Sequence, residues 1–446
     1  MQSIRRLVTA TSVTARRASL APLLAMAVAL PAAAQPATRA EPPRISLADA
    51  VAKGMTVAPD IADARGSVTV AEASQRRAKG SYLPSLSASA GTALASTERF
   101  DPNTSVTVSG AGAQLNAGLG LSWDVYTGGR RSAERTRTAA QLESFRSQLI
   151  SRERDLVLRI TTAWYGALNV ERLERVAASR LERAQVQLEA AKRRAEMGAA
   201  TKSDVLRAEL EVFNARTQGM EVETLLRAHR LELGRLVGER GPVAPTQGAE
   251  EPAGALELSA EELESLVSEH PDVASAMSSL EATRATVQQA KAGWLPQVRL
   301  SGGYDWFSPL PDVTEGRTGW SVRLGLSYPI FDGWARDETM QRARVNVTVA
   351  ESQVADLQRA VRTELERALD EERLAAWRVE VSRSAVEAAR EDLRVQQERY
   401  AVGTTTMLDL LTSQERLVQA ETDAIDASLA RAIARAQWVA LTGRAP

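Results

Sequence analysis

The sequence predicts a mainly α-helical chain with membrane-type β-strands, organised as two internal repeats. Three observations lead to this prediction: an internal duplication, four segments that alternate apolar and polar residues, and an apolar pattern that recurs every seven residues. The alternating segments place one β-hairpin in each repeat, and the seven-residue pattern places a long coiled-coil arm after each hairpin.

The duplication is clearest in two short stretches. LGLSWDVYTGGR begins at Leu119, and LGLSYPIFDGWAR begins 205 residues later, at Leu324. Upstream pairs such as Leu83 and Leu295, each followed by proline, lie 212 residues apart, so the first half carries seven extra residues between these points. One change in spacing with strict register on both sides indicates a loop-length change between duplicated units. The predicted domains are a first repeat at 45–238, a linker at 239–257 and a second repeat at 258–443.

Residues 1–34 resemble a secretory signal peptide. Four arginines and no acidic residue precede the end of the apolar run LAPLLAMAVALP, and Ala32–Ala34 provide a small-residue cleavage site. The alternative, an N-terminal membrane anchor, is disfavoured because the apolar run is short. The mature chain has no apolar run of 18 or more residues, so we expect no membrane-spanning helix.

Composition excludes several functional classes. The 55 Lys and Arg nearly balance the 56 Asp and Glu, which gives no sign of nucleic-acid binding. Cysteine is absent, so cysteine-based catalysis and cysteine metal sites are excluded. The two histidines, His229 and His270, lie far apart in the sequence, and no glycine-rich phosphate loop is present. We therefore predict no enzyme activity, no catalytic site, no metal site and no cofactor.

Four segments alternate apolar and polar residues with a period of two. In the last of them, Trp320, Val322 and Leu324 alternate with polar residues, which places one set on each face of a strand. The predicted strands are at about 85–95, 112–124, 297–307 and 319–330. Each has about the length of a tilted strand that crosses a bilayer. Aromatic residues near the strand ends predict a membrane girdle of Trp123, Trp294, Trp306, Trp320, Tyr328 and Phe331. The alternative is a soluble hairpin with one buried face.

Long helices follow both hairpins. Leucine, valine or alanine recurs every seven residues from Leu142 to Ala191, and the second half repeats this pattern from Val347. A sustained repeat of seven predicts a left-handed supercoil. The predicted helices are a long helix at about 131–197 and a return helix at about 203–237, then a long helix at about 335–401 and a return helix at about 405–442. A helix of this length spans roughly 100 Å at ~1.5 Å per residue.

Four membrane strands cannot close a β-barrel alone. An open sheet edge in lipid leaves backbone groups unpaired, at a cost of several kcal/mol each. Known membrane barrels have about eight strands or more. The chain is therefore expected to complete its barrel with copies of itself, and a barrel that is apolar outside and polar inside is a conduit.

The two Leu-Pro junctions, the duplicated LGLS hairpins and the segment RYAVGTTTMLDLL at 399–411 resemble the TolC family of outer-membrane efflux proteins over about residues 45–443. The resemblance implies a homotrimer in the outer membrane, with a β-barrel of twelve strands continued by a periplasmic α-helical barrel. A mixed collar around its middle would contain 45–57, the linker and the C-terminal end. The resemblance also implies passive conduction of substrates, in efflux or in type I secretion. The implied partners are a periplasmic adaptor (membrane fusion) protein, an inner-membrane transporter and outer-membrane lipid. The alternative function is a periplasmic coiled-coil adaptor or scaffold.

A short glycine-containing break separates each long helix from its return helix. Glycine suits such a break because it tolerates positive φ at a helix C-terminus. Candidate caps of the return helices are Thr201, Ser203 or Asp204 in the first repeat and Thr404, Thr405 or Thr406 in the second. The resemblance makes these breaks the periplasmic entrance, closed at rest and bound by an adaptor. Its implied docking tips are Gly198, Gly403, Arg194 and Arg399, and its implied gate residues are Asp204, Tyr400, Asp409, Ser203, Thr405 and Thr412.

Three gate positions match the family and two depart from it. Tyr400 and Asp204 match positions that bond across the closed entrance. Asp409 matches a recurring acidic position, and a ring of three such carboxylates would raise their pKa values. Thr405 stands where an arginine can brace the gate, and Thr412 where a further aspartate can narrow it. The alternatives are helix packing for Tyr400, an exposed helical carboxylate for Asp409 and simple capping for the threonines.

Overall fold

The computed structural model describes residues 41–101, 106–246, 258–309 and 316–443. The predicted signal peptide and most of the predicted linker lie outside these ranges. The first repeat contains β1 (Arg44–Ile45), α1 (Leu47–Val57), α2 (Pro59–Gly80), β2 (Ser85–Asp101), β3 (Val106–Tyr126), α3 (Arg130–Glu196) and α4 (Lys202–Leu236). After β4 (Ala244–Pro245), the second contains α5 (Ala260–Glu269), α6 (Pro271–Lys291), β5 (Gln297–Pro309), β6 (Arg317–Ser327), α7 (Ala335–Ala401) and α8 (Met407–Thr442).

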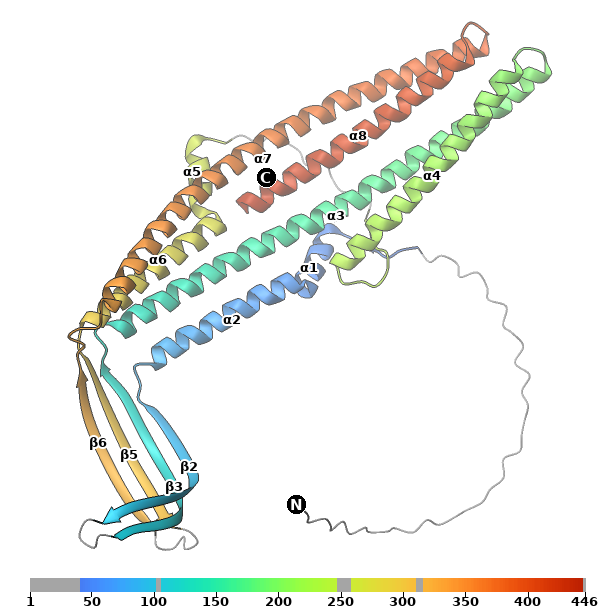
Figure 1. Ribbon diagram of the computed structural model, residues 1–446. Coiled ribbons are helices and arrows are strands. Elements are labelled where there is room, and N and C mark those ends of the chain that lie inside the picture. The colour runs from blue at the N-terminus through green and yellow to red at the C-terminus, as the bar shows by residue number, and fades with distance from the viewer. Residues whose placement is uncertain (1–40, 102–105, 247–257, 310–315, 444–446) are drawn as a thin grey trace, which may run out of the picture. The chain divides into compact units, whose positions relative to one another are not determined.

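The helices form a layer in which α3 and α7 run the full length, while α2 and α6 lie nearest the sheet and α4 and α8 lie towards the other end (Figure 1). Nearest the sheet, α3 packs against α2 on one side and α6 on the other, and α6 packs against α7. Towards the other end, α3 packs against α4 and α8, and α8 packs against α7. The layer therefore has two open edges, formed by α2 and α4 on one side and by α7 on the other.

The seven-residue pattern is the buried stripe of α3. Leu142, Leu156, Val170, Ala177 and Ala191 are buried at multiples of seven, and the change from leucine to alanine lets the neighbouring helices approach closely. Both long helices have 67 residues, which corresponds to ~100 Å. Within the described ranges, no helix is both long and apolar enough to cross a membrane.

Two hydrophobic cores, one in each repeat, lie along the helical layer away from the tips. In the first repeat, Ile160 and Trp164 of α3 pack with Ile45 and Val243, and the Trp164 Nε1–H donates to the carbonyl oxygen of Ile45 at 3.0 Å. This bond holds the N-terminal segment, where β1 pairs in parallel with β4. In the second repeat, α5, α6 and α7 pack around Trp438 near the end of α8.

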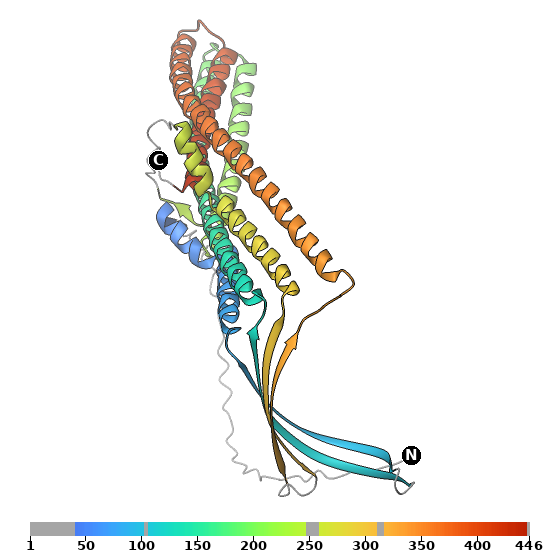
Figure 2. The ribbon, with the colours of Figure 1, turned by 90° about the vertical axis from the view of Figure 1, so that its left-hand side faces the viewer.

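The strands form one antiparallel sheet in the order β2-β3-β5-β6 (Figure 2). The first hairpin extends well beyond the predicted ends at 95 and 112, because small residues such as SGAGA show alternation only weakly. β6 ends at Ser327, before the predicted end at 330, since Pro329 has no N–H for the sheet. β2 and β6 are the edge strands, on the same sides as α2 and α7.

Candidate functional site at the helix tips

The two breaks between long and return helices have the same geometry. Gly198 and Gly403 have φ of 74° and 80°, the left-handed region that glycine enters without a side-chain clash. The N–H of Ala199 donates to the carbonyl of Arg194 at 2.7 Å, and the N–H of Thr404 donates to that of Arg399 at 2.9 Å. These bonds satisfy carbonyls at both helix ends, as in a Schellman motif.

Capping boxes begin both return helices. Of the candidate caps, Thr201 and Thr406 are the residues used. The Asp204 carboxylate accepts from the N–H and hydroxyl of Thr201 at 3.0 and 2.7 Å, and the Thr201 hydroxyl accepts from the Asp204 N–H at 3.2 Å. Asp409 and Thr406 repeat this reciprocal arrangement. At each tip, the capping box therefore gives hydrogen-bond partners to two backbone N–H groups at the start of the return helix, that of the threonine and that of the aspartate.

Hydrogen bonds set the direction of the aspartate pKa shifts within one protomer. The bonds from Thr406 lower the pKa of Asp409, with a further contribution from the Thr405 hydroxyl. The bonds from Thr201 likewise lower the pKa of Asp204. The predicted rise required carboxylates that face one another, whereas these carboxylates are engaged by hydroxyl and amide donors that stabilise the charged form. The expected rise in pKa concerns a ring of three Asp409 carboxylates, one per subunit, and it stays a prediction.

Arg194 connects the two helical hairpins. Its guanidinium carbon lies 4.6 Å from the centre of the Tyr400 ring, and its Nη1 donates to the Tyr400 carbonyl oxygen at 2.6 Å. Burial raises the pKa of the Tyr400 phenol, and the negative charge of Asp204 adds to that rise. Asp204 thus acts on Tyr400 electrostatically while its oxygens bond Thr201. Sequence reasoning assigned Arg194 to docking alone and missed this contact, which joins residues 206 apart.

An apolar core lies beneath this contact. Ala191 of α3, Ala208 of α4, Leu393 of α7 and Leu410 of α8 belong to one buried cluster, and Tyr400 packs against it. All four long and return helices therefore meet at the tip, so a change at Tyr400 is transmitted to both hairpins.

The other predicted tip residues have simpler surroundings. Ser203 and Arg399 are exposed. The Thr405 hydroxyl lies 3.2 Å from Gln396 Oε1 and 3.1 Å from Asp409 Oδ2. The Thr412 hydroxyl donates to the Leu408 carbonyl within α8 at 2.9 Å.

The contact surface between α3 and α8 is polar over much of its length, which the sequence pattern did not reveal. Its bonds and ion pairs are Arg154 to the Leu441 carbonyl, Asn169 to Asp426, Arg172 to Ser428, Arg180 to Glu415 and Arg183 to Glu421. Buried apolar clusters also join the helices, within the first hairpin and, at the tip, across both hairpins.

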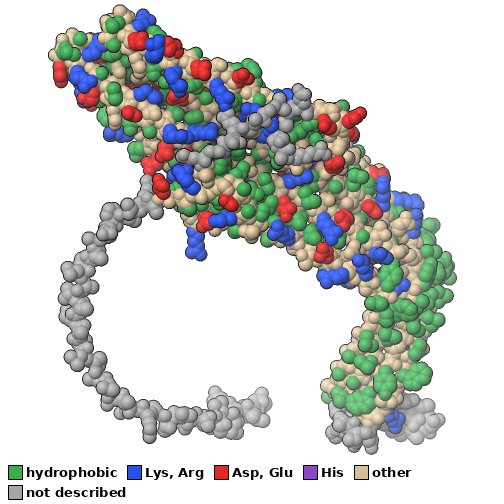
Figure 3. Space-filling model, turned by 180° about the vertical axis from the view of Figure 1, so that it is seen from behind, with side chains coloured by type: hydrophobic (Ala, Val, Ile, Leu, Met, Phe, Trp, Pro, Cys, Tyr) green, Lys and Arg blue, Asp and Glu red, His purple; other side chains and the backbone are tan. Residues whose placement is uncertain are grey.

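The sheet has two chemically different faces. One face presents exposed apolar side chains, including Leu86, Leu94, Tyr304, Trp320 and Leu324, and Figure 3 shows hydrophobic side chains gathered over the sheet. The other carries small and polar residues with a few charges, such as Arg299, whose Nε donates to Asp124 at 2.7 Å. Every residue of β6 is exposed, so the described chain covers neither face of that strand.

The predicted girdle residues lie near both ends of the sheet. Trp123, Trp294, Tyr328 and Phe331 lie near the helices, and Trp306 and Trp320 lie in the half farther from them. Trp320, Tyr328 and Phe331 are strongly exposed, whereas Trp123 and Trp306 are partly buried. The Trp123 Nε1–H donates to the Tyr82 carbonyl at 3.0 Å, which ties that ring to the end of α2.

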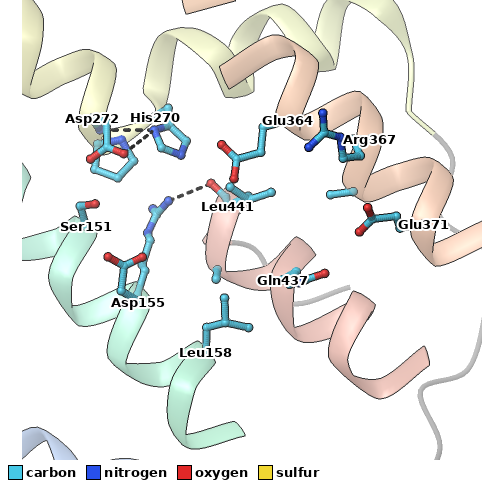
Figure 4. A pocket seen from close by; sticks show the side chains of 14 residues that line it. Ser151, Asp155, Leu158, His270, Asp272, Glu364, Arg367, Glu371, Gln437 and Leu441 are labelled. Carbon is cyan, nitrogen blue, oxygen red and sulfur yellow. Dashed lines mark hydrogen bonds and ion pairs between the residues drawn. The ribbon is translucent and has the colours of Figure 1, made fainter. Parts of the chain in front are cut away.

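A pocket of about 320 Å³ lies where α3, α7, α8 and the corner between α5 and α6 meet (Figure 4). His270 lines it, and its Nδ1 accepts from the N–H of Asp272 at 3.3 Å, so the imidazole caps α6. Burial lowers the pKa of His270. No cluster of potential metal ligands occurs among the residues described here. The geometry gives this pocket a structural role at the start of α6.

Comparison with known proteins identifies the chain. The sequence profile of the outer membrane efflux protein family matches residues 56–239 and 263–444, one match in each repeat. The chain belongs to this family. The TolC-like interpretation of the two hairpins and the tip segment is therefore confirmed, and this efflux protein is located in the outer membrane with a periplasmic helical extension.

Relatives of this efflux protein include an export protein of the outer membrane. The pyoverdine export outer membrane protein OpmQ of Pseudomonas aeruginosa is 27% identical over 393 residues, which cover 83% of this chain and 79% of OpmQ. Protein CyaE of Bordetella pertussis is 27% identical over 344 residues, covering 76% and 71%. The CmeC outer membrane channel of Campylobacter jejuni superposes with a TM-score of 0.79 at 16% identity, covering 89% of this chain and 85% of CmeC. These matches support the channel and not the alternative of an adaptor or scaffold.

Proposed function

We propose that this efflux protein is a homotrimeric channel-tunnel that passively conducts substrates from a periplasmic adaptor and an inner-membrane transporter to the exterior. The observation that carries this proposal is the exposed sheet. A four-stranded sheet with two open edges and an apolar face is unstable in lipid unless its edge strands are paired. Three copies supply twelve strands, which is within the range of known barrels.

The helical layer supports the same assembly. Its open edges lie on the same sides as the open edges of the sheet, so one association pairs β2 with β6 of a neighbour and brings α2 and α4 towards that neighbour's α7. A groove between α2 and α3 contains the small residues Gly66, Ser67 and Ala71 and the exposed Val70. On the opposite edge, α7 exposes Val345 and Val349, which are suited to fill such a groove.

The tips form the periplasmic entrance in this proposal. Arg194 and Tyr400 hold the two hairpins of each protomer together, and the polar surface between α3 and α8 permits their separation. Adaptor binding around Gly198 and Gly403 displaces the hairpins and opens the tunnel. The carboxylates of Asp204 and Asp409 place negative charge at this entrance. The names of relatives range from pyoverdine export to alkaline protease secretion, so the proposal assigns a conduit without a particular cargo.

Disulfide trapping tests the assembly, because the natural chain has no cysteine. Val70 lies ten residues before the end of α2 and Val345 ten residues after the start of α7, so both lie at a similar distance from the sheet. Val70→Cys combined with Val345→Cys should give trimers on oxidation that reducing agent dissolves. Each single cysteine variant is the matched control and should remain monomeric on denaturing gels. Monomers from the double variant in membranes that conduct ions would contradict the proposed pairing.

A further inference from the structure

Arg323 is a charged side chain within a strand that the proposed barrel places in the membrane. It lies on β6 between Val322 and Leu324, whose side chains belong to the apolar face of the sheet. Successive side chains of a strand point to opposite faces, so Arg323 belongs to the polar face. In the proposed barrel the polar face is the interior. A charged residue at membrane depth is costly unless it lines a water-filled cavity, and such residues mark the paths of substrates or ions.

Arg323 has no ion-pair partner in the part of the chain that the structure describes. Arg299, one strand away on the same face, is paired with Asp124 at 2.7 Å. The carboxylate of Asp305 leans over Gly118 of β3, where a Cβ atom would collide with it. Because β3 and β6 lie on opposite sides of β5, Asp305 turns away from Arg323. The guanidinium group is therefore free to meet a ligand.

A neighbouring copy would not supply a partner for Arg323 either. In the proposed assembly β6 pairs with β2 of the neighbour, and both strands have one end at the helices (Figure 2). Arg323 lies four residues from the helix end of β6, so it comes opposite the first half of β2. The residues of β2 on the polar face in that half are small and uncharged: Ser85, Ser87, Ser89, Gly91 and Ala93. Arg323 consequently stays unpaired when the edges of the sheet are joined.

The side chains around Arg323 leave the interior of the barrel open. Ser301 of β5 lies directly opposite Arg323, and Ser122 of β3 lies opposite Ser301. In the first repeat, the offset of 205 places Gly118 at the position of Arg323, without a charge. Each protomer thus contributes one unpaired arginine at this level, and three copies contribute a ring. Eight strands enclose a space that side chains fill, whereas twelve strands lined by serine and glycine enclose water.

The carboxylates of Asp305 lie at a different level of the barrel. Asp305 follows Ser301 by four residues along β5, which corresponds to ~13 Å. Salt screens charges over about 10 Å at 0.1 M. The aspartates therefore weaken the field of the three arginines without cancelling it.

We propose that the three Arg323 side chains form an anion-binding ring inside the β-barrel, which favours cargo that carries carboxylate or phosphate groups. A guanidinium group matches these groups because its N–H donors can bind two oxygens at once. Rings of arginine or lysine serve the same purpose in anion pores. This proposal rests on the proposed function, because the ring requires the trimeric barrel. It extends that function by naming anionic molecules as the class of cargo that the barrel attracts.

Block of the ion current by pyrophosphate tests the proposal. The full-length protein is reconstituted into planar bilayers, and pyrophosphate is added on the side of the β-hairpins, so that it reaches the barrel before the helix tips. Arg323→Ser removes the charge and leaves a residue type that is already common on this face. Arg323→Lys keeps the charge and is the matched control. Since the Arg323 side chain is exposed, both variants should fold as the natural chain does.

Pyrophosphate should block the natural channel and the Arg323→Lys channel at similar concentrations. The Arg323→Ser channel should need a several-fold higher concentration, because three favourable charge contacts are lost together. A natural channel that pyrophosphate does not block, or an Arg323→Ser channel that is blocked equally well, would overturn the ring and leave the proposed conduit intact. Reconstituted chains that conduct no ions would instead refute the proposed function, and the ring with it.

Discussion

Removing Arg194 should open the channel at its periplasmic end. The change Arg194→Ala deletes both contacts with Tyr400, the stacked guanidinium at 4.6 Å and the bond to the carbonyl at 2.6 Å. A cation–π contact and a charge-assisted hydrogen bond at this half-buried position together contribute roughly 1–2 kcal/mol per protomer. Three copies that separate together then contribute about 3–6 kcal/mol, so the open-to-closed ratio should rise about 10²- to 10⁴-fold.

Single-channel recording in planar bilayers measures this effect. Arg194→Ala should increase the time spent at high conductance, and Tyr400→Leu, which removes the ring but keeps the carbonyl, should have a smaller effect. The double variant should add little to Arg194→Ala, because both changes remove the same contact. Arg399→Ala is the matched control, since Arg399 is the exposed repeat counterpart of Arg194. If Arg194→Ala and Arg399→Ala give the same conductance as the natural chain, Arg194 does not restrain the entrance.

Two further predictions concern helix caps. Thr406→Ala should remove the cap of α8 and lower stability by about 1 kcal/mol per protomer, whereas Thr406→Ser should retain the cap. Urea unfolding of the detergent-solubilised protein compares the two variants, and equal unfolding midpoints would refute the capping role of Thr406. The pKa of His270 is lowered in the folded chain, so protonation of its imidazole favours the unfolded state. Its contribution to the free energy of unfolding is therefore fully present above the pKa of about 6.5 in the unfolded chain and is lost as pH falls below that value. His270→Asn keeps a capping side chain that does not titrate, so the loss of melting temperature between pH 7.5 and about 5.5 should be smaller in that variant; an unchanged difference would exclude His270 as its source.

The repeat made most of the architecture predictable from the sequence. Alternation in LGLS and its copy showed membrane-type strands, and the seven-residue stripe showed helices too long for an ordinary globular core. The family profile and the solved channels confirm the fold class that these patterns indicated. Strand ends were harder to predict. STERFD at 96–101 lacks an apolar alternation and SGAGA at 109–113 shows it only weakly, so the first hairpin is longer than predicted.

The chemistry of the tips was less accessible to sequence reasoning. The Thr406 and Asp409 spacing is a local signal, and a capping box could be anticipated from it. The stacking of Arg194 on Tyr400 depends on how two distant hairpins pack, which no local pattern encodes. Within one protomer the pKa of Asp409 is lowered by hydrogen bonds from Thr406 and Thr405, whereas the expected rise depends on like charges of three subunits and stays a prediction. Trp334 has a left-handed backbone conformation, with φ of 71°, and so does its repeat counterpart Gly129, with φ of 87°. The sequence pattern did not predict this conformation for a tryptophan.

The central claim is that one chain supplies a third of a membrane cylinder, and subunit counting on conducting channels tests it most directly. The cysteine-free chain permits one dye per protomer at an introduced cysteine such as Glu338→Cys. With complete labelling, photobleaching of single channels, recorded together with their current, should show three steps for every conducting unit. Conduction by units that bleach in one step would contradict the account, because a single sheet of four strands would then have closed a pore.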